Sequence, residues 1–172
     1  MKEFQIALIL GLGFSAVAQA NGGTINFTGR IIPSTCSINL GKPDLTVALG
    51  DVPASALATP GARAGKKEFA IEVTGCSGGG TKVAARFESG NADPASGQLK
   101  LDASSEAGGV QIAIYDESDG LNKFGEDVPA TSLRTLSGGA ATLRYSAWYV
   151  ATNDPVSPGT ANASATYTLV YE

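Results

Sequence analysis

Short runs of alternating apolar and polar residues, separated by turn residues, extend through almost the whole chain. Alternate positions of an extended strand share one face, so this pattern predicts β-strands rather than helices. Glycine supplies 22 of the 172 residues, and clusters such as Ser77-Gly78-Gly79-Gly80 and Ala92-Asp93-Pro94 are typical of turns. We therefore expect strands near 24–32, 34–40, 45–49, 68–74, 82–88, 98–102, 110–115, 141–150 and 163–171.

This regular spacing of short strands favours a single all-β domain with the architecture of a sandwich. The sequence has no internal repeat and no linker that would divide it. The stretch 53–66 is rich in Ala, Pro and Gly, and Pro53 and Pro60 leave room in it for only one helical turn, around Ala54–Leu57.

The composition excludes several classes of function. The chain has no histidine, which removes Ser-His-Asp and Cys-His catalysis and histidine-ligated metals. Its two cysteines are too few for a structural zinc site or an iron–sulfur cluster. A net charge of −4 without a basic run argues against binding nucleic acid. We therefore expect no enzyme activity, no metal and no cofactor.

Residues 1–20 have the pattern of a secretory signal peptide. Lys2 precedes an apolar run over 4–17, and the small-residue sequence Ala18-Gln19-Ala20 follows it. A membrane anchor is the alternative, but the run is shorter than the ~20 residues that span a bilayer. We expect cleavage after Ala20, and cleavage after Ala18 is the second possibility.

Export bears on the two cysteines, Cys36 and Cys76. An oxidising compartment favours a disulfide between them, which would stabilise the fold by about 4 kcal/mol in the loop-entropy treatment. Two free buried thiols are the alternative. The spacing excludes a CxxC redox motif.

Both ends of the expected mature chain carry a one-sided apolar strand. Near its start the small and apolar residues Gly23, Ile25, Phe27, Gly29 and Ile31 alternate with the polar residues Thr24, Asn26, Thr28 and Arg30. At its end Ala163, Ala165, Tyr167, Leu169 and Tyr171 alternate with Ser164, Thr166, Thr168 and Val170. An unpaired apolar edge promotes aggregation, so each of these strands needs something to cover it.

Taken together, these residues resemble the major subunit of type 1-like chaperone–usher fimbriae. The resemblance rests on the segment Asn21–Gly29, the cysteine pair and the last strand, with Tyr171 penultimate and Gly159 fourteenth from the end. It implies an immunoglobulin-like sandwich that lacks its seventh strand and leaves a groove lined by core residues. It also implies that the disulfide ties the first strand to the second.

The resemblance further implies a division of labour along the chain. Residues 21–33 would be a donor strand that fills the groove of another subunit, with Gly23, Ile25, Phe27, Gly29 and Ile31 facing the groove, and residues 34–172 the pilin domain. Before assembly a periplasmic chaperone would fill the groove and recognise a C-terminal pattern that includes Gly159, Tyr167, Leu169 and Tyr171. An outer-membrane usher and identical or related subunits would be the other partners.

The implied function is that of a structural subunit that polymerises into the shaft of an adhesive fimbria on a Gram-negative cell, after export through the periplasm. A minor or adaptor subunit near the fimbrial tip is the alternative, because it also carries both donor and groove. A tip adhesin would need a second, lectin-like domain. A secreted sandwich unrelated to fimbriae would instead be a complete monomer.

Four further patterns have simpler interpretations. The acidic stretch 116–127 lacks calcium-loop spacing and is interpreted as a solvated hairpin. The loop 77–80 lacks the Lys-Ser/Thr pair of a phosphate loop. The glycosylation patterns at Asn26 and Asn162 are attributed to chance. Trp148 and Tyr149 point to opposite faces of a strand, so we expect at least one of them to pack in the core rather than bind sugar.

Overall fold

The computed structural model describes residues 36–152 and 156–172. The expected signal peptide, residues 1–20, and the donor positions Gly23, Ile25, Phe27, Gly29 and Ile31 lie outside the described residues. Among the residues that are described, no helix is long and apolar enough to cross a membrane.

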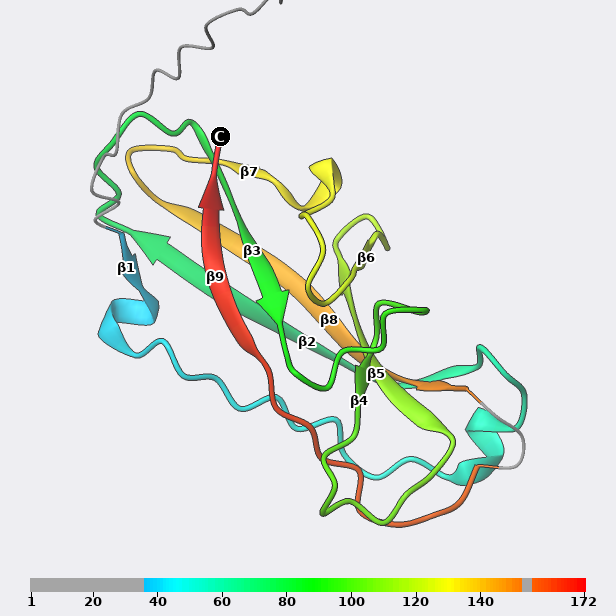
Figure 1. Ribbon diagram of the computed structural model, residues 1–172. Helices are drawn as coiled ribbons and strands as arrows, with labels where there is room; N and C mark the ends of the chain where they lie inside the picture. The colour runs from blue at the N-terminus through cyan, green and yellow to red at the C-terminus, as the bar shows by residue number, and fades with distance from the viewer. Residues whose placement is uncertain (1–35, 153–155) are drawn as a thin grey trace, which may run out of the picture. The chain divides into compact units, whose positions relative to one another are not determined.

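The described chain folds into an all-β sandwich of two sheets (Figure 1). The larger sheet has the strand order β1-β2-β8-β5-β4, with β6 paired to β5, and the smaller has the order β7-β3-β9. All pairings between these strands are antiparallel. The strands are β1 (Ser37–Ile38), β2 (Arg63–Thr74), β3 (Lys82–Glu88), β4 (Leu99–Lys100), β5 (Val110–Asp116), β6 (Leu121–Asn122), β7 (Arg134–Thr135), β8 (Ala141–Ala151) and β9 (Thr166–Tyr171).

Within 36–152 and 156–172, three short 3-10 helices lie between the strands: η1 (Asn39–Gly41), η2 (Ala54–Leu57) and η3 (Ala130–Ser132). The helical turn expected at Ala54–Leu57 is therefore present, and its Leu57 is buried. It begins directly after Pro53, the N-cap residue, which has an extended backbone conformation with φ −66° and ψ 136°.

The long central strands agree well with the sequence pattern, because their alternation coincides with burial. The expected strand at 82–88 has the same bounds as β3, and those at 110–115 and 141–150 are each one residue shorter than β5 and β8. Strand β2 begins earlier than expected, at Arg63, because a register shift between Ala64 and Lys67 lets pairing with β8 continue past Gly65.

The strand predictions were wrong near the start of the described chain. Among the described residues of the strand expected at 34–40, only Ser37–Ile38 form a strand, which ends there because Asn39 and Leu40 have φ values of 44° and 54°. The strand expected at 45–49 joins no ladder in the described structure. Its alternation nevertheless matches its burial, since Val47 and Leu49 pack against the core while their neighbours are exposed.

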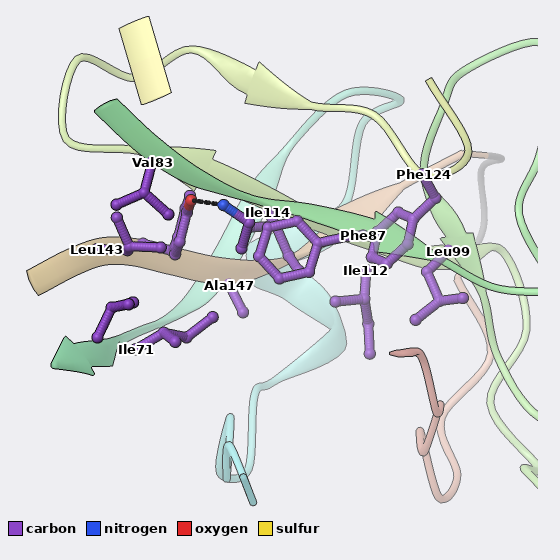
Figure 2. Packing of buried hydrophobic residues seen from close by; sticks show 12 residues of the cluster. Ile71, Val83, Phe87, Leu99, Ile112, Ile114, Phe124, Leu143 and Ala147 are labelled. Atoms are coloured by element: carbon purple, nitrogen blue, oxygen red, sulfur yellow. Dashed lines mark hydrogen bonds between the residues drawn. The ribbon is translucent and has the colours of Figure 1, made fainter. Parts of the chain in front are cut away.

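The core lies between the two sheets (Figure 2). Val83 and Phe87 of β3 meet Leu143 of β8 and Ile114 of β5 in this layer. The hydroxyl of Tyr145 on β8 accepts a hydrogen bond of 3.1 Å from the backbone N–H of Ala85 on β3, which joins the two sheets inside the core.

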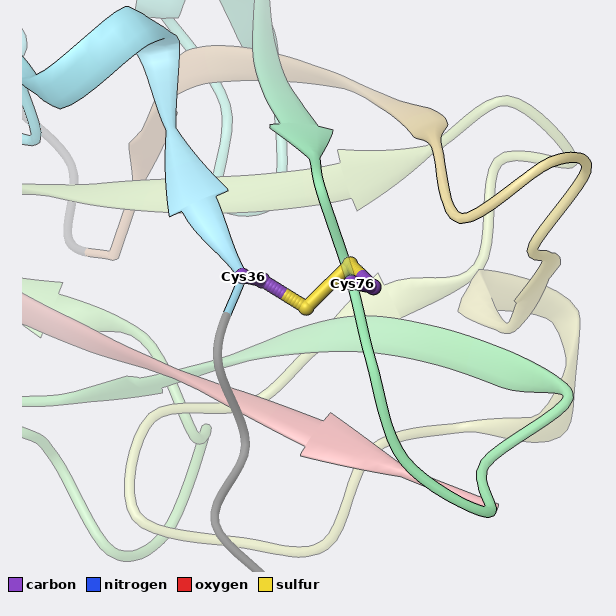
Figure 3. The surroundings of a disulfide bond; sticks show 2 residues. All are labelled: Cys36 and Cys76. Carbon is purple, nitrogen blue, oxygen red and sulfur yellow. A yellow bond between two sulfur atoms is a disulfide. The ribbon is translucent and has the colours of Figure 1, made fainter.

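The expected disulfide between Cys36 and Cys76 is present (Figure 3). It links the residue just before β1 to the segment just after β2. The backbone N–H of Cys76 also donates a 2.9 Å hydrogen bond to the carbonyl of Gly139, ahead of β8. The covalent link therefore holds the short first strand at the edge of the larger sheet, next to β2.

Candidate strand-binding groove

Strand β9 is an edge strand. It pairs with β3 from Val83↔Tyr171 to Glu88↔Thr166, and it has no second partner within 36–152 and 156–172. Hydrogen bonds also hold the C-terminal end of β9, because the backbone N–H groups of Thr81 and Lys82 both donate to the main-chain oxygen of Glu172. The other edge of β9 therefore presents unpaired backbone groups along an ordered strand.

The extended segment 42–53, which connects η1 to η2, forms the rim opposite β9. In Figure 1 this segment is the cyan coil that follows β1, and the red chain is β9 with the stretch leading into it. The segment lies outside every strand ladder in the described structure. The unpaired edge of β9 thus faces a backbone segment that joins no ladder, and we call the space between them the acceptor groove.

The acceptor groove consists of two hollows. The first has a volume of about 360 Å³ and lies between Pro43–Val47 on one side and Ala165–Tyr167 on the other. Its floor is formed by side chains of the core and its margin: Ile38, Phe69, Ile71, Phe87 and Ile114. The second, about 1000 Å³, lies between residues 45–57 and residues 156–163. The first hollow therefore reaches down to the surface of the hydrophobic core, whose residues Ile71, Phe87 and Ile114 are themselves buried.

The core-facing side chains of β9 are only partly covered. Tyr167, Leu169 and Tyr171 all pack against the core cluster, yet each remains half-buried. Leu45 on the opposite rim is 42% exposed. Apolar area left open on both rims favours a ligand that is itself extended and apolar on one face.

Tyr167 also makes a polar contact across the groove. Its hydroxyl donates a 2.6 Å hydrogen bond to the carbonyl of Pro43 on the opposite rim. Burial raises the pKa of Tyr167, and the nearby carboxylate of Asp44 raises it further. The phenol therefore stays neutral and able to donate throughout the physiological pH range.

This chain is similar in sequence to known proteins over almost its whole length. A model of the family described as "Fimbrial protein" matches residues 25–172. The chain belongs to the fimbrial protein family. Among its relatives, an F17 fimbrial protein of Escherichia coli is 35% identical over 100% of both chains. An S-fimbrial protein subunit of E. coli is 33% identical over 96% of this chain and 93% of its own.

Solved structures agree on the fold of this fimbrial protein. A structure of a chaperone–usher pilus superposes with a TM-score of 0.65 at 20% identity, and the match covers 92% of this chain and 100% of the other. The expected immunoglobulin-like sandwich is confirmed. The family is one of structural subunits, and its products belong to an extracellular fimbrium.

The structure separates the four C-terminal residues singled out in the sequence. Tyr167, Leu169 and Tyr171 lie together on the core side of β9, and Tyr167 lines the first hollow. Gly159 lies apart from them, in the segment before β9, where it lines the second hollow. Whether a chaperone recognises these residues stays a prediction.

Several residues of the groove were not singled out from the sequence. Pro43, Val47 and Leu49 contribute to the rim, and Phe69 contributes to the floor. The alternation of Leu45, Val47 and Leu49 was the available signal, but it was interpreted as a paired strand.

The two neighbouring aromatics of β8 point in opposite directions, as expected. Tyr149 packs inside, and its hydroxyl donates to the carbonyl of Ala161 at 2.9 Å. Trp148 lies outside the core cluster, and the guanidinium of Arg63 sits 5.2 Å from its ring centroid. Lys66 approaches the same ring at 5.8 Å. Trp148 therefore takes part in cation–π contacts on the outer side of β8.

The acidic stretch is not simply a solvated hairpin. Asp119 and Glu117 do lie near the surface, paired with Arg63 and Arg134. Asp116, however, is only 4% exposed. Its carboxylate accepts four hydrogen bonds, from the hydroxyls of Thr131 and Ser132 and the backbone N–H groups of Ser118 and Gly120. Among the described residues there is no group of three or more side chains that could hold a metal ion.

Proposed function

We propose that this fimbrial protein is a shaft subunit that polymerises by donor-strand exchange, in which the N-terminal segment of one subunit fills the acceptor groove of the next. The observation that carries the proposal is the unpaired edge of β9 beside a hollow whose floor is the hydrophobic core. An added strand would find backbone groups to pair with on both sides, from β9 and from segment 42–53.

The chain carries a segment of suitable chemistry in residues 21–33. Ile25, Phe27 and Ile31 would share one face of an extended strand, and Gly23 and Gly29 would lie on that face where the groove is shallow or where a neighbouring side chain fills the space. Each large side chain would contribute roughly 1.5–3 kcal/mol on burial. Each backbone hydrogen bond would add about 0.5–1.5 kcal/mol net. The sum of these terms would make a slowly dissociating joint between subunits.

The groove also bears on how the subunit would reach the cell surface. An open groove is an aggregation hazard, so a subunit exported by residues 1–20 needs a periplasmic chaperone to cover β9 until the next subunit arrives. The side chains available to that chaperone are Tyr167, Leu169 and Tyr171. An outer-membrane usher would then assemble the Gram-negative surface fimbria. An adaptor subunit would use the same groove, and abundance in purified fibres separates the two roles.

The decisive experiment changes the donor segment alone. Phe27→Asp would place an unpaired charge in the groove of the neighbouring subunit, so we expect cells that produce it to lack filaments by electron microscopy. Thr28→Asp is the matched control, because Thr28 belongs to the polar face, and filaments should persist. Normal-length filaments from Phe27→Asp would refute the donor assignment.

A further inference from the structure

Gly159 occupies a position where no side chain fits. A Cβ atom there would lie 2.6 Å from the backbone N of Ala107 and 2.6 Å from both the carbonyl carbon and the Cβ of Glu106. The residue also has φ +155°, which L-residues rarely adopt. Two independent constraints therefore select glycine at this position.

This close approach belongs to an extended contact between segment 157–162 and loop 102–108. Ser157 and Gly108 exchange two backbone hydrogen bonds of 3.2 Å, and the N–H groups of Glu106 and Ala107 both donate to Thr160 O at 3.0 Å. The carbonyl of Asn162 accepts hydrogen bonds from the N–H of Asp102 and the hydroxyl of Ser105, and the N–H of Asn162 donates to that hydroxyl. Gly159 lies in the middle of this docked segment.

The docked segment is also a wall of the acceptor groove. Gly159, Thr160 and Ala161 line the second hollow, opposite segment 45–52 and beside Ala107. Tyr149 lines the same hollow, and its hydroxyl donates a hydrogen bond to the carbonyl of Ala161. The position of this wall, and of the chain as it enters β9, therefore depends on the contact with loop 102–108.

We propose that Gly159 is a positioning residue: its missing side chain lets segment 157–162 dock on loop 102–108, and that contact sets the groove wall against which the incoming strand is received. This inference rests on the proposed donor-strand function. It assigns Gly159 a role within its own subunit, independent of any direct contact with a chaperone.

The test uses full chains that all carry Phe27→Asp, so that their own N-terminal segment does not compete. A labelled peptide copying residues 21–33 is the probe, and the rate of its binding is followed by fluorescence anisotropy. Hydrogen exchange at the amides of Glu106 and Ala107 reports the contact itself. The control is Gly90→Ala. A Cβ atom at Gly90 would have no atom within 4 Å, and the φ of Gly90 does not lie between +20° and +160°.

We expect Gly159→Ala to speed exchange at both amides by about tenfold and to slow peptide binding by a similar factor. The added Cβ atom would clash with Glu106 and Ala107 and so move segment 157–162 away from loop 102–108. Ser105→Ala, which loosens the same contact without altering Gly159, should change both readouts in the same direction by a smaller factor. It also keeps the test informative if Gly159→Ala does not fold.

Other outcomes overturn the inference. Faster exchange with unchanged peptide binding would mean that the contact does not serve the groove. Slower binding with unchanged exchange would mean that Gly159 meets the incoming strand directly. If the chain with glycine at 159 does not bind the peptide at all, the donor-strand function itself fails, and the positioning role fails with it.

Discussion

Strands β3 and β9 are neighbours in one sheet and share the same alternation, yet their core faces differ in burial. Val83, Ala85 and Phe87 of β3 are 0–5% exposed, whereas Tyr167, Leu169 and Tyr171 of β9 remain half-buried. Strand β3 has β7 and β9 on its two sides, and β9 has only β3 within the described chain. Burial of a strand is thus decided by its lateral neighbours as well as by its own pattern.

The largest expected effect lies in the fully enclosed layer. Leu143 on β8 is 0% exposed, so Leu143→Ala should lower the free energy of unfolding by about 2–5 kcal/mol. The effect should be similar with and without the 21–33 peptide, because this site needs no added strand. Urea unfolding of the disulfide-intact chain measures it. A large peptide dependence would show that the enclosed layer is not complete in the open subunit.

Leu169 offers the contrasting measurement on β9. In the open subunit Leu169→Ala should cost about 1 kcal/mol, because the side chain is half-exposed, and with the 21–33 peptide bound it should cost about 2–5 kcal/mol. The same urea titration, run with and without peptide, checks the difference. Thr168→Ala, on the exposed face of β9, is the control. Equal costs in the two states would break the comparison between β3 and β9.

Asp116 gives a pH-dependent effect of intermediate size. Burial by itself raises the pKa of Asp116, but the four hydrogen bonds to its carboxylate outweigh burial and hold the pKa below its ordinary value of 3.8. Its contribution to stability is therefore present above the ordinary pKa and is lost as the pH falls through the lowered value.

We expect Asp116→Asn to lower the free energy of unfolding by about 1.5–3 kcal/mol at pH 7, since charge-assisted hydrogen bonds are lost. It should also flatten the acid side of the stability profile, measured as the urea midpoint between about pH 5 and pH 2. An unchanged acid limb in the variant would assign the acid sensitivity to other carboxylates.

The smallest expected effect is at the hydrogen bond between the sheets. Tyr145→Phe removes the acceptor for the buried N–H of Ala85 and should cost about 1 kcal/mol in the open subunit, measured by urea unfolding. The bond lies on the β3 side of the comparison, so added peptide should leave this cost unchanged. A cost that disappears with peptide would place Tyr145 among the residues that adjust to the added strand.

The sequence pattern was most informative where neighbours in the chain and neighbours in space impose the same requirement. Alternation located β3, β5 and β8 almost to the residue, and the export signal correctly suggested the Cys36–Cys76 disulfide. It failed at 45–49, where the alternation is real but the ladder partner is missing. It also failed at Asp116, because the hydroxyls of Thr131 and Ser132 that surround this carboxylate approach from a later segment.

The sequence by itself determined that this chain is a β-sandwich whose strand β9 is apolar on one face, and it predicts a second one-sided strand in residues 21–33, because period-two alternation is a local property of an extended backbone. Only the tertiary structure decided that β9 and segment 42–53 face one another across a hollow with core residues at its floor, and that Gly159 lies against loop 102–108. Pairing partners and close backbone approaches join residues far apart in the chain, so no local pattern specifies them.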